Sequence, residues 1–188
     1  MPEILLVSDS HLSPDTPEAV RNWDAVVALV GRDRPDLVVH TGDVSLNGLH
    51  SPDELDLARA QLDRLPVPWF AVPGNHDIGD IGGKANAIDD GRRAAYEERI
   101  GPRFWVRQLG RWRLIGFDSQ ELLADEARGQ AVIDQLAAQI AGPYPIALFQ
   151  HRPLLPVDDP EGDTARRYIT EPSRSPLRRL MARPEVKL

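Results

Sequence analysis

Short apolar runs that have the length of buried strands alternate with helical segments in the first part of this chain. The runs are Ile4–Val7, Leu37–His40 and residues 69–72, and helices are expected between them at residues 17–31 and 52–65. Strands that alternate with helices favour a parallel sheet built from crossover units. This order therefore predicts an α/β fold that contains a parallel sheet.

Two of the expected helices begin with a capping signal. Thr16 is expected to cap the first helix, with a proline in the first helical position, and Gly31 is expected to end it. Ser51 and Glu54 are expected to form a capping box at the start of the second helix.

The second part of the chain departs from this alternation. Gly110 and Arg111 separate two apolar runs and predict a two-residue hairpin between antiparallel strands. Residues 78–91 are expected to form an exposed polar insertion and residues 152–171 an acidic, proline-rich loop. The remaining strands are expected at residues 105–109, 112–117 and 146–149, and the remaining helices at residues 94–100, 132–140 and 175–181. No domain boundary is visible, so residues 1–188 are expected to form a single domain.

The composition excludes several classes of protein. Lys and Arg number 22 against 29 Asp and Glu, and the resulting net charge of −7 argues against a general nucleic-acid or membrane-surface binder. The chain has no cysteine, which excludes disulfide scaffolds, zinc ribbons and thiol nucleophiles. Its longest apolar run, residues 25–30, is far shorter than a membrane span, and no signal peptide is visible. We therefore expect a cytoplasmic domain without a membrane or nucleic-acid partner.

Residues that can bind metal ions follow four of the expected strands. Asp9 and His11 come after the first strand, Asp43 after the second, Asn75 after the third and His151 after a later one. Because ligands of open α/β sheets bind beyond the carboxyl ends of the strands, these side chains are expected to converge. Carboxylates and imidazoles suit Mn, Fe or Zn better than Ca, and without thiolates a structural zinc site is disfavoured. The pattern predicts an open, catalytic metal site.

Each of these residues also has an ordinary structural explanation when it is taken alone. Asp9 and His11 fit a turn aspartate and a surface histidine, and Gly42-Asp43 is common turn chemistry. His151 alone would more often be a structural histidine than a ligand. Residues 74–77 form a much rarer motif, although a capped turn also uses Asn and Asp. The joint occurrence of these residues, in order and at strand ends, favours the metal site.

In these motifs the chain resembles the calcineurin-like metallophosphoesterase superfamily. The matching motifs are Asp9-Ser10-His11, Gly42-Asp43, Gly74-Asn75-His76-Asp77 and His151-Arg152-Pro153. The first two look most like the bacterial branch of cyclic-nucleotide and glycerophosphodiester phosphodiesterases. The resemblance implies a four-layer αββα sandwich of two mixed β-sheets flanked by helices. It also implies two divalent metal ions, bridged by a carboxylate and by a hydroxide that attacks phosphorus.

The resemblance also assigns the metal ligands. Asp9 and His11 would bind the first metal, Asn75 and His151 the second, and Asp43 would bridge both. An amide ligand such as Asn75 adds no negative charge, so the metal pair stays electrophilic.

Further residues of these motifs would act on the substrate. His76 would contact the phosphate or protonate the leaving group, and Asp77 is expected to orient His76. Asn75 would contact the substrate as well as a metal. Arg152 stands where the branch often has a second histidine, and it is expected either to bind phosphate or to lie on the surface.

Three residues outside the motifs keep an open interpretation. His40 is expected near the site as a strand-end residue, and His50 is expected to be exposed. Asp118 resembles an aspartate that the family has at a strand end, but a structural turn explains it equally well.

The chain departs from the family pattern at its end. The family carries a Gly-His-x-His motif after one more strand, whereas no histidine follows His151 here. The last residues, from Val186 onward, look like the opening of that strand, so the domain is interpreted as C-terminally truncated and without its last strands. We therefore expect the 188-residue chain to be weakly active or inactive.

The sequence thus predicts a dinuclear metal-dependent phosphoesterase that hydrolyses small phosphodiesters or phosphomonoesters, with diesters favoured. The alternatives are a nuclease of the same fold and a non-catalytic binding scaffold. The acidic charge balance argues against the nuclease. The clustered charged ligands argue against the scaffold, and about two metal ions per chain would exclude it.

Overall fold

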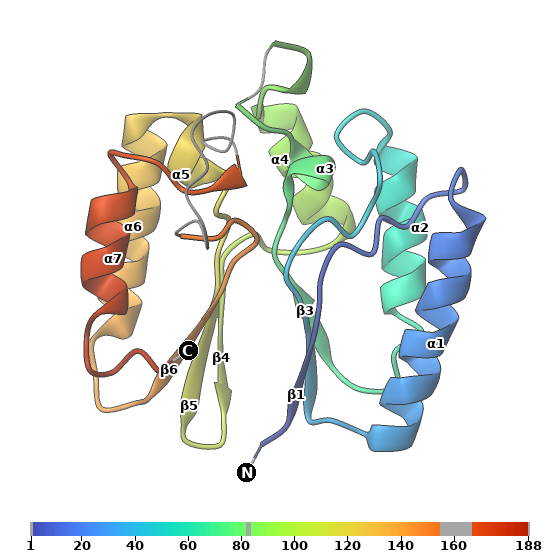
Figure 1. The fold of residues 1–188 in the computed structure, drawn as a ribbon, viewed down its shortest axis with the longest axis horizontal. Coiled ribbons are helices and arrows are strands. Elements are labelled where there is room, and N and C mark those ends of the chain that lie inside the picture. The colour runs from blue at the N-terminus through green and yellow to red at the C-terminus, as the bar shows by residue number, and fades with distance from the viewer. Residues whose placement is uncertain (1, 82–83, 155–166, 188) are drawn as a thin grey trace.

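The chain forms two β-sheets that pack against each other, with helices on their outer faces (Figure 1). This computed structural model describes residues 2–81, 84–154 and 167–187. Its strands are β1 (Ile4–Val7), β2 (Leu37–His40), β3 (Trp69–Ala71), β4 (Trp105–Leu109), β5 (Trp112–Gly116) and β6 (Ile146–Phe149). Its helices are α1 (Pro17–Asp33), α2 (Pro52–Leu62), α3 (Asn75–Ile78), the 3-10 helix η1 (Lys84–Asn86), α4 (Asp90–Arg99), α5 (Glu121–Ala124), α6 (Glu126–Ile140) and α7 (Arg174–Met181).

The first sheet consists of three strands in the order β1-β2-β3. Leu5 pairs with Val38, and Val39 pairs with Phe70, both in parallel register. Helices α1 and α2 are the crossovers that bring the chain back to the same end of the sheet, as the alternation predicted. All three described strands are therefore parallel, whereas the family resemblance led us to expect a mixed sheet here.

The second sheet is mixed, as expected. Strands β4 and β5 form the predicted antiparallel hairpin, in which Trp105 lies opposite Gly116. Strand β6 then pairs with β5 in parallel register. Beside β6, Val186 forms an isolated parallel bridge with Ile146, at the position where the last apolar run was expected to begin a strand.

Three apolar clusters fill the spaces between the layers. Trp23 and Leu55 belong to the cluster between the first sheet and helices α1, α2 and α4. Leu136 and Leu177 belong to the cluster between the second sheet and helices α6 and α7. The third cluster lies between the sheets and contains Leu37, Val39, Val72, Trp105, Leu114, Ala147 and Phe149. The predicted four-layer αββα arrangement is confirmed (Figure 1).

Helix α1 begins at Pro17 as predicted, but its two ends are formed differently. The Thr16 hydroxyl makes no capping hydrogen bond and instead donates to the His11 carbonyl at 3.0 Å. The helix continues through Gly31 to Asp33, and the next residue, Arg34, adopts a left-handed conformation with φ 50°. Arg34 donates its backbone N–H to the Val30 carbonyl and so supplies the helix end that was expected at Gly31.

Helix α2 begins at Pro52, but the predicted capping box is wrong. Ser51 makes no side-chain capping bond, and the Glu54 carboxylate accepts hydrogen bonds from Ser13 Oγ at 3.0 Å and from the Asn47 N–H at 2.8 Å. Glu54 is buried and therefore ties α2 to the loops that follow β1 and β2.

Three short helical segments, α3, η1 and α5, were not expected. Helix α4 begins at Asp90, four residues earlier than predicted, and the Asp89 carboxylate caps it by accepting the Arg92 N–H at 2.8 Å. The expected insertion at residues 78–91 is exposed over most of its described length, but Ile78 is completely buried. Residues 155–166 of the expected acidic loop lie outside the described residues. Among the helices that the structure describes, none has both the length and the apolar character to cross a membrane.

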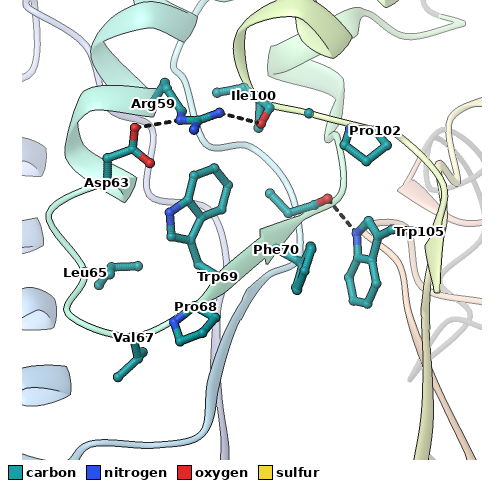
Figure 2. A pocket seen from close by; sticks show the side chains of 12 residues that line it. Arg59, Asp63, Leu65, Val67, Pro68, Trp69, Phe70, Ile100, Pro102 and Trp105 are labelled. Carbon is teal, nitrogen blue, oxygen red and sulfur yellow. Dashed lines mark hydrogen bonds and ion pairs between the residues drawn. The ribbon is translucent and has the colours of Figure 1, made fainter. Parts of the chain in front are cut away.

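The open edge of β3 borders a hollow of about 450 Å³ (Figure 2). Trp69 lies in its wall, with the Arg59 guanidinium stacked 5.1 Å from the centre of its ring. The Trp105 indole N–H donates to the Ala71 carbonyl at 2.8 Å, so a side chain from the second sheet occupies a hydrogen-bonding position at this edge. No candidate metal ligand lines this hollow.

Candidate metal centre

The predicted ligands meet at the carboxyl ends of the strands. Asp9 and His11 follow β1, Asp43 follows β2, Asn75 opens α3 directly after β3, and His151 follows β6. All five line one cavity of about 760 Å³, together with His76, Asp80, Arg152, Pro153 and Arg167. Residues that are up to 142 positions apart in the sequence therefore share one cavity.

Asp43 lies at the centre of this group. Its carboxylate is buried, and Oδ2 lies 3.5 Å from His151 Nε2 and 4.0 Å from His11 Nε2. Two sets of side chains have ligand atoms within 4.8 Å of one another, namely Asp9, Asp43 and His151, and His11, Asp43 and His76. Asp43 belongs to both sets, which is the position required of a bridging carboxylate.

Three of these residues adopt a backbone conformation that is unfavourable for side-chain-bearing residues. Asp9, His11 and Asp43 have φ angles of 55°, 45° and 54°. Left-handed conformations of residues other than glycine cost on the order of 1–3 kcal/mol each and concentrate at functional sites. In this structure they turn each strand end so that its polar side chains can line the cavity.

Gly74 allows the first sheet to close around Asp43. A Cβ atom at position 74 would overlap Asp43 Oδ1. The same oxygen accepts the His76 backbone N–H at 2.9 Å, so the start of α3 holds the carboxylate in place. The glycine of this motif is therefore explained by a close approach to the central ligand.

The hydrogen bonds of His151 show which ring nitrogen is available to a metal. Nδ1 lies 3.0 Å from the Thr41 carbonyl, which can only accept, so Nδ1 carries the proton. When the ring is neutral, Nε2 then carries a lone pair. It lies 3.3 Å from Asn75 Oδ1 and 3.5 Å from Asp43 Oδ2. With Nε2 unprotonated, all three atoms are acceptors that a cation can join, and this donor set of carboxylate, imidazole and amide oxygen fits a divalent metal.

His11 completes the other side of the site. Its Nε2 lies 3.9 Å from Asp9 Oδ1, while its Nδ1 is buried without a hydrogen-bond partner among the described residues. The His11 and His76 rings meet edge to face, with their centres 4.7 Å apart.

His76 is oriented by a backbone carbonyl. Its Nδ1 donates to the Leu46 carbonyl at 2.5 Å, which leaves Nε2 as the ring atom available for other contacts. The loop that follows β2 therefore sets the direction of this ring, together with the Asp43 contact to the His76 backbone.

Asp77 does not have the contact predicted for it. Its carboxylate is completely buried and accepts hydrogen bonds from the backbone N–H groups of Val44, Ser45 and Gly74 and from the Ser45 hydroxyl. Burial, with the nearby charge of Asp43, raises the pKa of Asp77 to about 6 against the opposing effect of these hydrogen bonds. Asp77 thus fixes the loop beside Asp43, and the expected hydrogen bond to His76 is replaced by the Leu46 contact.

Arg152 lies in the wall of the cavity but not on the surface. It is 3% exposed, and its guanidinium contacts Asp80 and Gln120. Asp80 and Arg167 also line the cavity, and neither was predicted. Both lie in polar stretches without hydrophobic periodicity, so no local pattern distinguished them from their neighbours.

The structure distinguishes the environments of His40, His50 and Asp118. His40 is completely buried beneath the site, where its Nε2 contacts Ser10 Oγ, and His50 is exposed. Asp118 is buried outside the cavity lining and accepts the Gln120 N–H at 2.8 Å and an Arg103 N–H at 2.7 Å. These contacts support the structural-turn interpretation of Asp118. Burial raises its pKa to about 6.

Comparison with known proteins agrees with this geometry. The glycerophosphodiester phosphodiesterase GpdQ of Enterobacter lignolyticus is 34% identical over 151 residues, which cover 76% of this chain and 51% of that protein. A probable cyclic nucleotide phosphodiesterase of Moraxella catarrhalis is 32% identical over 99 residues, or 52% of this chain and 32% of that protein. The chain thus spans about half the length of the GpdQ relative.

Solved structures share the fold at low sequence identity. A dimetal phosphatase from Danio rerio superposes with a TM-score of 0.68 at 14% identity, over 98% of this chain and 79% of that one. A purple acid phosphatase from yellow lupin gives a TM-score of 0.67 at 16% identity, over 99% of this chain and 36% of that one. The model of the calcineurin-like phosphoesterase family matches residues 2–187, and the chain belongs to this family.

Proposed function

We propose that this chain is a weakly active hydrolase of small phosphodiesters that depends on two divalent metal ions. The observation that carries the proposal is the set of facing acceptors, His151 Nε2, Asn75 Oδ1 and Asp43 Oδ2, with Asp43 shared by a second set of ligand atoms. Asp9 and His11 would hold the first metal, Asn75 and His151 the second, and Asp43 both.

The metals would supply positive charge to the phosphate and lower the pKa of water at the site. The chain's own residues would do the remaining work. Asn75 binds through a neutral amide oxygen, so it does not reduce the attraction for an anion. His76, with Nδ1 committed to Leu46, can offer Nε2 to the phosphate or to the leaving oxygen. Thr41 holds His151 in the tautomer that leaves its Nε2 free to bind.

The donor set also supports a choice of metals. Carboxylate, imidazole and amide ligands suit Mn, Fe and Zn, and they offer too few oxygens for a typical Ca²⁺ site. We propose these three ions as the candidates, to be tested by metal analysis of the purified chain.

Metal content and hydrolysis of bis(p-nitrophenyl) phosphate test the function together. We expect about two metal ions per chain and a hydrolysis rate that EDTA abolishes and Mn²⁺ restores. Asp43→Asn should lower kcat/KM by about a hundredfold or more, because a neutral amide with one oxygen cannot replace a carboxylate that would bridge both metals. Asp63→Asn serves as the matched control, since Asp63 pairs with Arg59 on α2, outside the cavity. A chain that binds no metal, or an Asp43→Asn variant as active as the control, would overturn the proposal.

A further inference from the structure

A partly buried ion pair forms part of the wall of the cavity that holds the candidate metal ligands. Arg152 donates from Nη2 to Asp80 Oδ1 at 2.6 Å, and its side chain is 3% exposed. Both residues line the cavity that holds the candidate ligands. The charge of an arginine beside the substrate site is therefore met by a carboxylate of the protein itself.

The arginine is held firmly in this position. Its Nε donates to Gln120 Oε1 at 2.6 Å, and its backbone N–H donates to Ser119 Oγ at 2.9 Å. Gln120 and Ser119 are both completely buried. Arg152 therefore cannot move away from the cavity without breaking several buried contacts.

Asp80 is held in place by hydrogen bonds of the segment that follows α3. It follows α3, its backbone N–H donates to the Asn86 carbonyl at 2.7 Å, and Oδ1 also accepts the Ile81 N–H at 2.6 Å. Its side chain keeps 25% of its surface exposed. The Asp80 carboxylate is thus partly exposed in the lining of the cavity, where it can act on an anion that enters.

The charge of the substrate decides what such a pair does. A phosphodiester carries one negative charge, whereas a phosphomonoester has a second ionisation with a pKa of about 6 and carries nearly two at neutral pH. An arginine without a carboxylate partner would favour the dianion, because guanidinium groups bind phosphate oxygens in charge-assisted pairs. Asp80 offsets that attraction and repels the additional charge.

We propose that Asp80, by neutralising Arg152, is a specificity-determining residue that makes the site select monoanionic phosphodiesters over dianionic phosphomonoesters. This inference rests on the proposed function and names the substrate class of that same site.

Anion binding to the metal-free protein tests the proposal without any turnover. Inorganic phosphate at pH 8 and dimethyl phosphate are titrated separately into the EDTA-treated chain and followed by calorimetry. Wild type should bind dimethyl phosphate at least as tightly as phosphate, and a preference of wild type for phosphate above about threefold would overturn the proposal. Asp80→Asn should raise the affinity for phosphate about tenfold and change that for dimethyl phosphate less than threefold.

Three further variants isolate the pair. Asp80→Ser removes the same charge and keeps an acceptor oxygen, so it replaces Asp80→Asn if circular dichroism shows that the latter is unfolded. In Asp80→Asn/Arg152→Gln the gain in phosphate affinity should disappear. Asp63→Asn breaks an Asp–Arg pair outside the cavity and should bind both anions like wild type. An equal gain in Asp63→Asn would contradict the assignment to Asp80.

Turnover separates this inference from the proposed function. With Mn²⁺ bound, the ratio of kcat/KM for bis(p-nitrophenyl) phosphate to that for p-nitrophenyl phosphate should fall about tenfold in Asp80→Asn. If wild type hydrolyses the diester and the ratio does not change, the specificity role of Asp80 is wrong and the hydrolase proposal stands. If no variant hydrolyses either ester but Asp80→Asn gains phosphate affinity, the charge effect stands and the hydrolase proposal is wrong.

Discussion

His40 lies completely buried at the end of β2 with both ring nitrogens in use. The Gly42 N–H donates to Nδ1 at 3.3 Å, so Nε2 carries the proton and donates to Ser10 Oγ at 2.9 Å. Ser10 Oγ in turn donates to the Val44 carbonyl at 3.1 Å. Burial lowers the pKa of His40 to about 3, because a protonated ring would be a charge in a poorly solvated position. The neutral ring thus supports the two loops that carry Asp9 and Asp43.

This burial predicts a pH dependence of stability. In the unfolded chain His40 titrates near its ordinary pKa of 6.5, and in the folded chain near 3. Its stabilising contribution is therefore complete above pH 6.5 and is lost as the pH falls from there toward 3. Between pH 7 and pH 5 the free energy of unfolding should fall by about 2 kcal/mol more in wild type than in His40→Gln.

Urea denaturation of the EDTA-treated proteins at the two pH values measures this difference. His50→Gln is the matched control, because it removes an exposed histidine in place of the buried one. Its pH dependence should equal that of wild type. Identical pH dependence in wild type and His40→Gln would show that burial of His40 is not the cause.

The close approach of Gly74 to Asp43 predicts an effect on metal affinity. A Cβ atom there would overlap Asp43 Oδ1, so Gly74→Ala should displace the central carboxylate. We expect the affinity for Mn²⁺, measured by calorimetry, to fall about tenfold or more, as for loss of a residue that orients a ligand. Gly31→Ala is the control, since nothing lies within 4 Å of a Cβ in that helix. Unchanged affinity in Gly74→Ala would refute the steric explanation.

Single residues also show where the sequence was sufficient. The positions of Asp9 and Asp43 follow from the rule that parallel strands end at a common edge, which needs only the order of elements. His151 follows β6 of the second sheet, so its place beside them also depends on how the two sheets pack. The contact of Asp77 could not be predicted, because a hydrogen-bond partner depends on the path of the loop after β2. Asp80 reaches the cavity through the turn after α3, and no periodicity marks that turn.

Among the elements, the β4–β5 hairpin shows that a local sequence signal for a turn can also determine a contact between the two sheets. Gly110 and Arg111 predicted the turn, and the resulting register places Trp105 opposite Gly116. The indole then reaches across to the Ala71 carbonyl on β3, so the second sheet touches the edge of the first (Figure 2). The bare backbone at position 116 makes room for the ring.

Substitution of Gly116 tests this packing. A Cβ atom at Gly116 would overlap the Trp105 indole, so Gly116→Ala should lower the free energy of unfolding by about 1–3 kcal/mol, as measured in urea. In a double-mutant cycle with Trp105→Leu, the same alanine should be less destabilising, because the ring that it would meet has been removed. Additive effects of the two substitutions would contradict the clash.

The elements that were missed share a physical cause. Helices α3 and α5 have four residues each, too short to show a 3.6-residue period, and they exist through tertiary contacts. The extension of α1 past Gly31 was missed for a similar reason. The end of the helix depends on the left-handed conformation of Arg34, which no local sequence signal predicts. Longer elements with an apolar face were found, although α6 begins at Glu126, six residues before its predicted start.

In the molecule as a whole, the candidate metal site lies where the two sheets meet. Asp9, His11, Asp43 and Asn75 come from the first sheet, and His151 comes from the second. The sheets share an apolar cluster, and at the site His151 Nε2 of the second sheet lies 3.3 Å from Asn75 Oδ1 of the first, where a shared cation would join them. Metal binding is therefore expected to join the layers as well as to support catalysis.

This arrangement predicts that metal removal destabilises the fold as a whole. At a free Mn²⁺ concentration of about 100 times the Kd, binding should add about 2.7 kcal/mol and raise Tm by about 5–10 °C relative to protein in EDTA. His151→Ala removes the ligand that the second sheet supplies, so its rise in Tm should be less than about half that of wild type. His50→Ala, a loss of an exposed histidine outside the cavity, should keep the full rise and is the control. An undiminished rise in Tm in His151→Ala would mean that residues of the first sheet hold the metal without help from the second. Metal binding would then not join the two sheets.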